Sequence, residues 1–544
     1  MDFSNKVVYE IYPKSFQDTN HDGVGDLRGV IHRLDYLAEL GVDYLWLTPF
    51  FVSPQRDNGY DVADYCRVDP RFGTMADLEE LVEEAGRQGM GLMLDMVFNH
   101  TSTQHQWFQK ALAGDPVYQD YYIFRSGEKL PTNWVSKFGG PAWKYVPQLG
   151  KWYLHLFDET QADLNWNNPR VREELKNVLR FWKGKGVQGF RFDVVNLISK
   201  PDVLADDQEG DGRRFYTDGP HVHEFLQELV RDAGIGDMIT VGEMSSTSLE
   251  NCLRYSGAGT GELSMCFNFH HLKVDYKDGD KWALMPPDRA ALLRLFDTWQ
   301  TKMQEGNGWN AVFWCNHDQP RVVSRLGDDV AYREVSAKML ATCIHLLRGT
   351  PYIYQGEELG MTNAGFTSID QYRDVESRNY YQILLDEGKT PEEALDILAA
   401  RSRDNARTPM QWDAGENAGF TDGEPWIPVQ SNYREINAEE ALRQPDSVFH
   451  YYQALIRLRK ELPVIQEGDI SFLYPDQSDV FAYRRTLDGE TVLVLCNLLP
   501  EGRALSVAGT YQKRLGNYPD LQWDGQTITL RPYEAVVLMA LHDS

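Results

Sequence analysis

The chain has 544 residues, of which 42% are hydrophobic and 12% are aromatic. This composition is typical of a folded globular protein, and the length suits roughly three domains, or fewer if one of them is a large barrel. The formal net charge of −27 disfavours binding to nucleic acid and docking to an anionic membrane. An anionic substrate would therefore need a local basic pocket.

The six cysteines are scattered and show no Cys-x-x-Cys spacing, so neither a disulfide framework nor a zinc site is indicated. The N-terminal residues lack the charged and then apolar pattern of a signal peptide, and no run reaches the ~18 apolar residues of a membrane span. We therefore expect a cytoplasmic protein with neither a nucleic-acid partner nor a membrane partner. The oligomeric state cannot be read from the sequence.

Strand-like runs alternate with amphipathic helical runs along most of the chain, in the order expected of a (β/α)₈ barrel. We predict strands at residues 7–16, 42–50, 90–100, 189–195, 240–244, 263–269, 312–318 and 351–354. We predict helices at residues 27–40, 75–88, 171–185, 221–232, 289–304, 333–347 and 448–460. In such a barrel the active site lies at the C-terminal ends of the strands.

Three segments depart from this alternation. Residues 101–165 are rich in aromatic residues and are predicted to form an inserted subdomain after the third strand. A long excursion at residues 360–444 is expected to shape the mouth of the site. Short alternating runs from residue 464 to 544 indicate a C-terminal β-sandwich, which leaves residues 1–100 and 166–463 for the barrel.

Charged and polar residues stand at the ends of several predicted strands. Asp193, Glu243 and Asp318 follow the fourth, fifth and seventh strands, and Arg191 lies two residues before Asp193. Each acid alone could be a solvated or salt-bridged carboxylate, but one barrel end would bring them together. A pair of carboxylates, one ionised and one protonated, is what the cleavage of a glycosidic bond requires.

Four motifs resemble those of the α-amylase family of retaining glycoside hydrolases. They are the runs at residues 95–100, 189–193, 241–243 and 313–318, and the run at 161–166 extends the match. The runs at residues 53–61 and 402–409, with Val194 after the expected nucleophile, are similar to the oligo-1,6-glucosidase branch. The resemblance covers the predicted barrel.

The resemblance assigns roles to individual residues. It makes Asp193 the nucleophile, Glu243 the acid/base and Asp318 the third acid, which holds sugar hydroxyls during ring distortion. Further substrate-binding residues are expected to hold the same glucose and to close the far end of its subsite. These residues are Asp57, Tyr60, His100, Gln161, Arg191, His317 and Arg403. A closed subsite implies an exo-acting pocket rather than a cleft. We expect no organic cofactor.

A basic run follows the sixth predicted strand. His270, Lys273 and Lys281 belong to this run, which is unusual in an acidic chain and could also be an ordinary solvated loop. Lysine and histidine are suited to binding a phosphate. Within the branch, the chain resembles a phospho-α-glucosidase over nearly its whole length. This resemblance implies that these three residues bind the phosphate of a small disaccharide phosphate. The products would be glucose and glucose 6-phosphate.

An acidic loop after the first strand carries oxygen-bearing side chains at alternate positions. The candidate ligands of a structural Ca²⁺ are Asp18, Asn20, Asp22, Val24 through its carbonyl, and Asp26. The match to an EF-hand loop is partial, because Gly29 stands where a glutamate would be expected. An acidic turn without metal is the alternative reading.

Two other functions remain open. One is an enzyme of the same branch that acts on unphosphorylated sugars, either an oligo-1,6-glucosidase of isomaltase type or a sucrose isomerase. The other is a non-catalytic barrel that serves as a binding module, which would be expected to lack one of the three acids and often to carry a membrane anchor. The chain retains Asp193, Glu243 and Asp318, which favours an enzyme.

Overall fold

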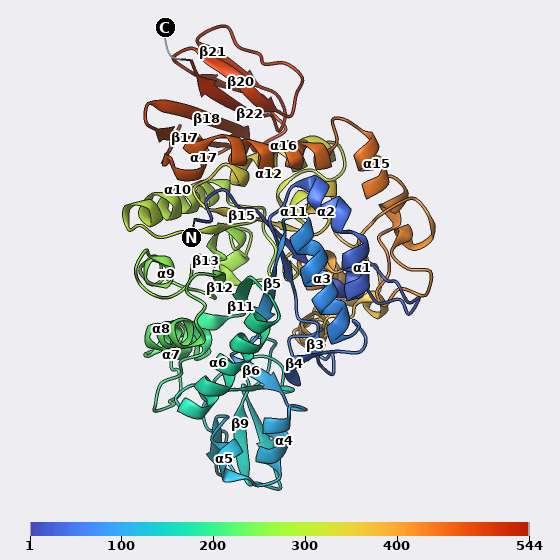
Figure 1. The fold of residues 1–544 in the computed structure, drawn as a ribbon, viewed down its shortest axis with the longest axis vertical. Coiled ribbons are helices and arrows are strands. Elements are labelled where there is room, and N and C mark those ends of the chain that lie inside the picture. Colours follow the sequence, from blue (N-terminus) through green and yellow to red (C-terminus); the bar gives the residue numbers. More distant parts are fainter. Residues whose placement is uncertain (1, 542–544) are drawn as a thin grey trace.

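The computed structural model describes residues 2–541 and contains a barrel of eight parallel strands (Figure 1). The sheet order is β13-β12-β11-β5-β2-β1-β15-β14, and a parallel bridge between Cys266 and Asn310 links the two edges. The strands are β1 (Val8–Ile11), β2 (Tyr44–Leu47), β5 (Gly91–Met96), β11 (Gly189–Phe192), β12 (Ile239–Glu243), β13 (Met265–Phe267), β14 (Ala311–Val312) and β15 (Thr350–Tyr354). The predicted (β/α)₈ barrel is thus confirmed.

Helices surround the barrel because each presents one apolar face to the sheet. The main ones are α1 (Leu27–His32), α2 (Leu34–Leu40), α3 (Met75–Arg87), α6 (Pro169–Gly184), α8 (Val222–Ala233), α9 (Leu249–Ser256), α10 (Arg289–Glu305), α12 (Arg333–His345) and α16 (Val448–Glu461). Polar N-cap side chains begin several of them. Thr74, for example, forms a capping box with Asp77 at the start of α3.

Several predicted elements differ from the structure. The strand predicted at 90–100 ends at Met96, and His100 begins a separate short strand. The helix predicted at 27–40 is divided into α1 and α2 at Arg33, whose backbone is non-helical. The strand predicted at 7–16 ends at Ile11, because Pro13 begins a 3-10 turn there and has no N–H for the ladder. The strand predicted at 312–318 ends at Val312, so Asp318 lies on a turn rather than on a strand.

The segment between β5 and α6 contains two small antiparallel sheets, one of β6 (His100–Ser102) with β10 (Gln161–Asp163). The other comprises β7 (Phe124–Ser126), β9 (Lys151–Leu154) and β8 (Trp143–Val146). Its helices are α4 (Gln106–Leu112) and α5 (Pro116–Gln119). A separate apolar cluster joins this segment to Val194 and Leu197, just beyond β11, so that it packs beside the expected nucleophile.

The C-terminal residues form two antiparallel sheets, at the opposite end of the molecule from α4, α5 and β9 (Figure 1). The larger sheet has the order β16-β17-β18-β22-β20, and the smaller pairs β19 with β21. Their bounds are β16 (Asp469–Phe472), β17 (Val480–Leu487), β18 (Glu490–Asn497), β19 (Arg503–Ser506), β20 (Tyr511–Gly516), β21 (Thr527–Leu530) and β22 (Ala535–Ala540). One face of β17 packs on the barrel helices, while Val480 and Ala482 on its other face pack within the C-terminal domain.

The excursion after β15 carries α13 (Val375–Asp386), α14 (Pro391–Arg401) and α15 (Ala438–Arg443). Its residues form an apolar core of their own, which also includes Trp282 from the loop after β13. The excursion and that loop are therefore packed together beside the barrel mouth. No helix within residues 2–541 combines the length and the apolar character that crossing a membrane would require.

Candidate active site

Arg191 lies at the centre of a buried polar cluster at the C-terminal ends of the strands. Its Nη1 donates to Asp95 Oδ1 at 3.0 Å and to Asp193 Oδ1 at 2.8 Å. Its Nη2 contacts the carboxylate of Glu243. The parallel register of β5 and β11 pairs Arg191 directly with Asp95. One guanidinium therefore holds acids from three neighbouring strands.

Asp193 and Glu243 lie close together because they contact adjacent nitrogens of the same guanidinium. This proximity is compatible with the ~5–5.5 Å carboxyl separation that retaining glycosidases use. Burial raises the pKa of Asp193, and the charge of Arg191 opposes that shift. The next residue, Val194, has a left-handed backbone with φ 35°, which is unusual for a β-branched side chain and typical of strain at functional sites.

Asp318 is held in a network of cationic groups. Arg407 Nη2 donates to its Oδ1 at 2.9 Å, and His317 Nε2 lies 3.3 Å from its Oδ2. His317 Nδ1 also lies 2.5 Å from Glu10 Oε2. Burial lowers the pKa of His317, but Asp318 and Glu10 outweigh burial and raise it to about 9. Despite its own burial, the pKa of Asp318 is held well below the usual range by His317 and the arginines.

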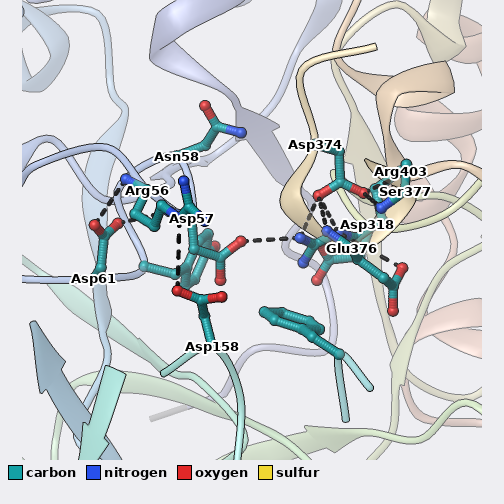
Figure 2. A network of polar contacts seen from close by, with 12 residues as sticks. Arg56, Asp57, Asn58, Asp61, Asp158, Asp318, Asp374, Glu376, Ser377 and Arg403 are labelled. Atoms are coloured by element: carbon teal, nitrogen blue, oxygen red, sulfur yellow. Dashed lines mark hydrogen bonds and ion pairs between the residues drawn. The ribbon is translucent and has the colours of Figure 1, made fainter. Parts of the chain in front are cut away.

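Arg403, from the excursion, closes one end of the site (Figure 2). Its Nη2 lies 2.9 Å from Asp57 Oδ1 and 2.5 Å from Asp374 Oδ1, and its Nη1 lies 3.5 Å from Asp318 Oδ1. The other oxygen of Asp57 accepts from Gln161 Nε2 at 2.9 Å. Burial raises the pKa of Asp57 to about 7 against the opposing charge of Arg403. These contacts tie the loop after β2 to the excursion and to β10.

Tyr60 and His100 lie at the same end of the site. The Tyr60 hydroxyl donates to Asp95 Oδ2 at 2.8 Å, and its ring stacks on His317 with centroids 5.0 Å apart. His100 Nε2 lies 2.9 Å from the Tyr60 carbonyl, and burial lowers its pKa. Burial thus disfavours the charged form of His100, which lies beside Tyr60 at this end of the site.

The basic loop after β13 reaches the same site through two of its three predicted residues. Lys273 and Lys281 line a hollow of about 200 Å³ together with Glu243 and Asp318. Lys273 Nζ lies 3.3 Å from the Ser246 hydroxyl, whereas Lys281 Nζ lies 2.5 Å from a Glu376 carboxylate oxygen.

His270 is not among the described residues that line this hollow. Its Nε2 lies 2.7 Å from the Thr247 carbonyl, and its ring stacks on Trp299. Burial lowers the pKa of its imidazole. The structure thus places the His270 side chain away from the hollow, where it contacts the backbone that follows β12.

The acidic loop at residues 18–26 brings several of its predicted ligands together. With its amide nitrogen turned toward the carboxylates, Asn20 lies 2.8 Å from Asp18 Oδ1 and 2.9 Å from Asp22 Oδ1. Val24 donates its N–H to Asp22 Oδ1 at 2.9 Å, and Asp26 caps α1 by accepting from Gly29. Within residues 2–541, no group of three or more His, Cys, Asp or Glu side chains is arranged to hold a metal ion.

Four site residues were missed by the sequence analysis. Glu10 lies one residue before the end of β1, close to the position that the predicted acids have on their strands, and that position could have indicated it. Arg407 lies in the motif at 402–409 but was given no role, and Asp374 precedes a helical run as an N-cap. Lys137, in the inserted segment, lines the hollow beside Lys273, and no sequence signal points to it.

Comparison with known proteins agrees with this geometry. The model "Alpha amylase, catalytic domain" matches residues 10–468, and "Alpha-amylase SusG C-terminal domain" matches residues 480–537. The chain is 55% identical to the trehalose-6-phosphate hydrolase of Escherichia coli (strain K12) over 540 residues, with 98% of each chain covered. The corresponding protein of Bacillus subtilis (strain 168) is 53% identical, with 98% of this chain and 97% of the relative covered.

Among solved structures, trehalose-6-phosphate hydrolase from Bacillus licheniformis superimposes with a TM-score of 0.95 at 52% identity. The match covers 99% of this chain and 100% of that one.

Proposed function

Because the chain belongs to the α-amylase family, we propose that it is a retaining α-glucosidase that hydrolyses trehalose 6-phosphate to glucose and glucose 6-phosphate. The observation that carries the proposal is a single hollow that is lined by Glu243 and Asp318 and also by Lys273 and Lys281. The printed names of the bacterial relatives support the same substrate. Because a phosphorylated substrate suits an enzyme of the cytoplasm, we propose that the protein acts in that compartment.

In this mechanism Asp193 attacks the anomeric carbon while Glu243 protonates the glycosidic oxygen, so that glucose 6-phosphate leaves and a glucosyl-enzyme ester forms. Water, deprotonated by Glu243, then attacks the anomeric carbon and releases glucose, and Asp193 is regenerated as a carboxylate. Arg191 touches both acids and keeps Asp193 in place. Asp318 is ionised and is proposed to accept hydrogen bonds from hydroxyls of the same glucose.

The proposed exo-acting pocket rests on the closed wall formed by Asp57, Arg403 and Gln161. Tyr60, His100 and His317 line the same wall. An ion pair at this position leaves room for a terminal glucose but not for a chain that continues past it. The proposal therefore predicts release of one glucose from the non-reducing end.

The substrate proposal is tested by a comparative assay. Trehalose 6-phosphate, trehalose, isomaltose and sucrose are supplied to the purified protein, and glucose, glucose 6-phosphate and any isomerised disaccharide are measured separately. We expect equal amounts of the two products from trehalose 6-phosphate, and much lower kcat/KM values for the other sugars. Preferential cleavage of isomaltose would instead identify an oligo-1,6-glucosidase, and rearrangement of sucrose would identify an isomerase.

We further propose a structural Ca²⁺ in the loop at residues 18–26. Asp18 and Asp22 already converge on the side-chain amide of Asn20. Binding of a cation would require this amide to turn its oxygen inward, and that oxygen, the carboxylates, Asp26 and the Val24 carbonyl are donors that a hard cation prefers. When bound, the cation would supply positive charge between carboxylates that repel one another. The loop is joined to the excursion, since Thr421 Oγ1 donates to Asp18 Oδ2 at 2.5 Å, so the cation would stabilise that junction.

Metal removal tests this proposal. Treatment with a chelator should lower the melting temperature by a few degrees, and added Ca²⁺ should restore it, because a ligand that binds the folded state alone stabilises it. Asp22→Asn should reduce the response to the chelator. An unchanged melting curve after verified removal of bound metal would leave the loop as an acidic turn.

A further inference from the structure

The hollow next to the catalytic acids contains a lysine that the proposed phosphate site does not yet include. Lys137, Lys273 and Lys281 all line it, but they come from separate parts of the chain. Lys137 belongs to the inserted segment between β5 and α6, whereas the other two follow β13. The mouth of the site is therefore basic on more than one of its walls, in a chain whose net charge is −27.

The three lysines differ in how much of their charge is already neutralised. Lys281 forms an ion pair with Glu376, so an incoming anion has to compete with a carboxylate. Within residues 2–541, the side-chain nitrogen of Lys273 has one hydrogen-bond partner, the Ser246 hydroxyl. Among the described residues, no carboxylate oxygen lies within 4.0 Å of Lys137 Nζ, which lies over the ring of Tyr216 at 5.5 Å from the centroid. Lys137 and Lys273 thus offer the less compensated charges.

The backbone around Lys137 is fixed. Its own N–H donates to the Leu156 carbonyl at 2.8 Å, and the neighbouring Ser136 hydroxyl donates to the Phe157 carbonyl at 2.6 Å. Phe138, on the other side, is buried and packs edge-on against Phe157. The side chain therefore extends into the hollow from a well-supported turn, which lowers the entropic cost of binding a ligand.

The electrostatics also favour an anion at this position. Burial lowers the pKa of Lys137 to about 8, and the nearby Arg213 and Lys273 add to that effect. Asp211 and Asp163 offset this effect only in part. An incompletely compensated buried ammonium is unfavourable, so a phosphate oxygen would both stabilise its charged form and relieve its repulsion with Lys273. Arg213 is less available, since it lies against Asp211 with Nη2 to Oδ2 at 2.7 Å.

We propose that Lys137 binds the 6-phosphate of the leaving sugar together with Lys273, so that the inserted segment helps to determine the preference for phosphorylated disaccharides. This inference rests on the proposed function, because it assigns a residue to the same substrate. The proposal also changes the roles of the predicted phosphate-binding residues. Lys137 and Lys273 supply most of the positive charge, Lys281 contributes in competition with Glu376, and His270 supports the loop.

The test compares Lys137→Met with Lys144→Met. Lys144 belongs to the same segment, but it is exposed on β8 and is paired with Glu159 at 3.3 Å. For each protein, kcat/KM is measured with trehalose 6-phosphate and with p-nitrophenyl α-glucoside. Losing one charged contact to phosphate should lower the ratio of the two values by about 10- to 100-fold in Lys137→Met, and Lys144→Met should keep the wild-type ratio.

A second measurement uses inhibition. Glucose 6-phosphate should inhibit hydrolysis of the aryl glucoside, and its inhibition constant should rise in Lys137→Met by about the same factor as the substrate ratio falls. Lys137→Arg, which keeps the charge, should recover part of both effects, and this recovery distinguishes binding from a general loss of folding. Melting curves identify any variant that does not fold.

The outcomes separate the two proposals. If the wild type prefers trehalose 6-phosphate and Lys273→Met loses that preference while Lys137→Met keeps it, the role of Lys137 is wrong and the proposed function stands. If the wild type shows no preference for the phosphorylated sugar, the proposed function itself fails. Equal losses on both substrates in Lys137→Met would make Lys137 a structural residue.

Discussion

Arg191 joins acidic residues that come from three neighbouring strands of the barrel. A single buried guanidinium contacts Asp95, Asp193 and Glu243, so the acids that repel one another are brought together by a shared cation. Breaking such a contact leaves an uncompensated buried charge, which typically costs ~3–5 kcal/mol. The arrangement explains why the motif Arg-x-Asp must lie at the end of one strand, where both charges face the barrel interior.

The contacts of Asp193 and Glu243 with one guanidinium predict retention of anomeric configuration. The first-formed glucose should be the α-anomer, observed by NMR before mutarotation. Asp193→Ala should abolish turnover, since no ester can form, while circular dichroism shows that the fold is kept. Early release of β-glucose would contradict the assignment of Asp193 as nucleophile.

His317 gives the protein a defined alkaline response. Burial opposes its charge, but Asp318 and Glu10 raise its pKa to about 9, above the ~6.5 of an unfolded chain. Its contribution to stability is therefore complete below about pH 6.5 and is lost as the pH rises through about 9. One proton bound only in the folded state gives a slope of about 1.4 kcal/mol per pH unit in this window.

Glu10→Gln tests this assignment by removing one of the two charges that raise the pKa of His317. The variant should deprotonate His317 at a lower pH, so its free energy of unfolding should level off earlier than that of the wild type. Denaturant titrations at a series of pH values between about 6 and 10 measure both curves. Parallel curves across this range would show that His317 is not the group responsible.

At the scale of elements, α13 positions Arg403 through its N-cap. Asp374 accepts from the N–H groups of Glu376 and Ser377, and it also pairs with Arg403. The same carboxylate therefore starts the helix and orients Arg403, which is proposed to close the glucose subsite (Figure 2). A cap and an ion pair are separable, because asparagine caps a helix about as well as aspartate does.

Asp374→Asn should thus keep α13 and weaken the hold on Arg403. We expect kcat/KM to fall by about 10-fold or more on trehalose 6-phosphate and on p-nitrophenyl α-glucoside alike, because a small misplacement of a binding group is costly. Asp374→Ala should add a loss of stability of ~1 kcal/mol from the missing cap. Wild-type kinetics in Asp374→Asn would mean that Asp57 alone fixes Arg403.

The strands and the site differ in how far the sequence predicts them. The strand pattern, the inserted segment and the cluster around Arg191 follow from periodicity and from polar residues at strand ends. The division at Arg33 and the short β14 could not be read in this way, because both depend on tertiary contacts. Arg33, for example, donates to Gln17 and lies over Trp412.

The phosphate region shows the same limit. The loop after β13 stands out by its charge, but charge does not reveal that Lys281 is paired with Glu376 or that His270 faces the Thr247 carbonyl. Lys137 is a single lysine in a segment without periodicity, and only the folding of that segment over Val194 brings it to the site. Residues that meet across long separations in sequence lie beyond pattern analysis of one chain.

At the scale of the whole molecule, one face of the larger C-terminal sheet belongs to the same hydrophobic core as the barrel. Alternate residues of β17 face opposite ways, so that Phe481 and Tyr483 pack on the barrel while Val480 and Ala482 pack inside the C-terminal domain. Phe481 lies edge-on to Phe296 of α10, with centroids 4.9 Å apart. The Tyr483 hydroxyl donates to the Cys343 carbonyl of α12 at 3.0 Å.

This shared core predicts a single unfolding transition for barrel and C-terminal domain. Phe481→Ala should remove ~3–5 kcal/mol from the stability of both, although Phe481 is remote from the catalytic residues. Unfolding followed by tryptophan fluorescence and thermal loss of p-nitrophenyl α-glucoside hydrolysis should shift together to lower temperature. Leu505→Ala, which affects only the inner core of the C-terminal domain, is the matched comparison. If Leu505→Ala unfolds in two steps and hydrolytic activity survives the first step, the two domains unfold independently and the packing of Phe481 does not couple them.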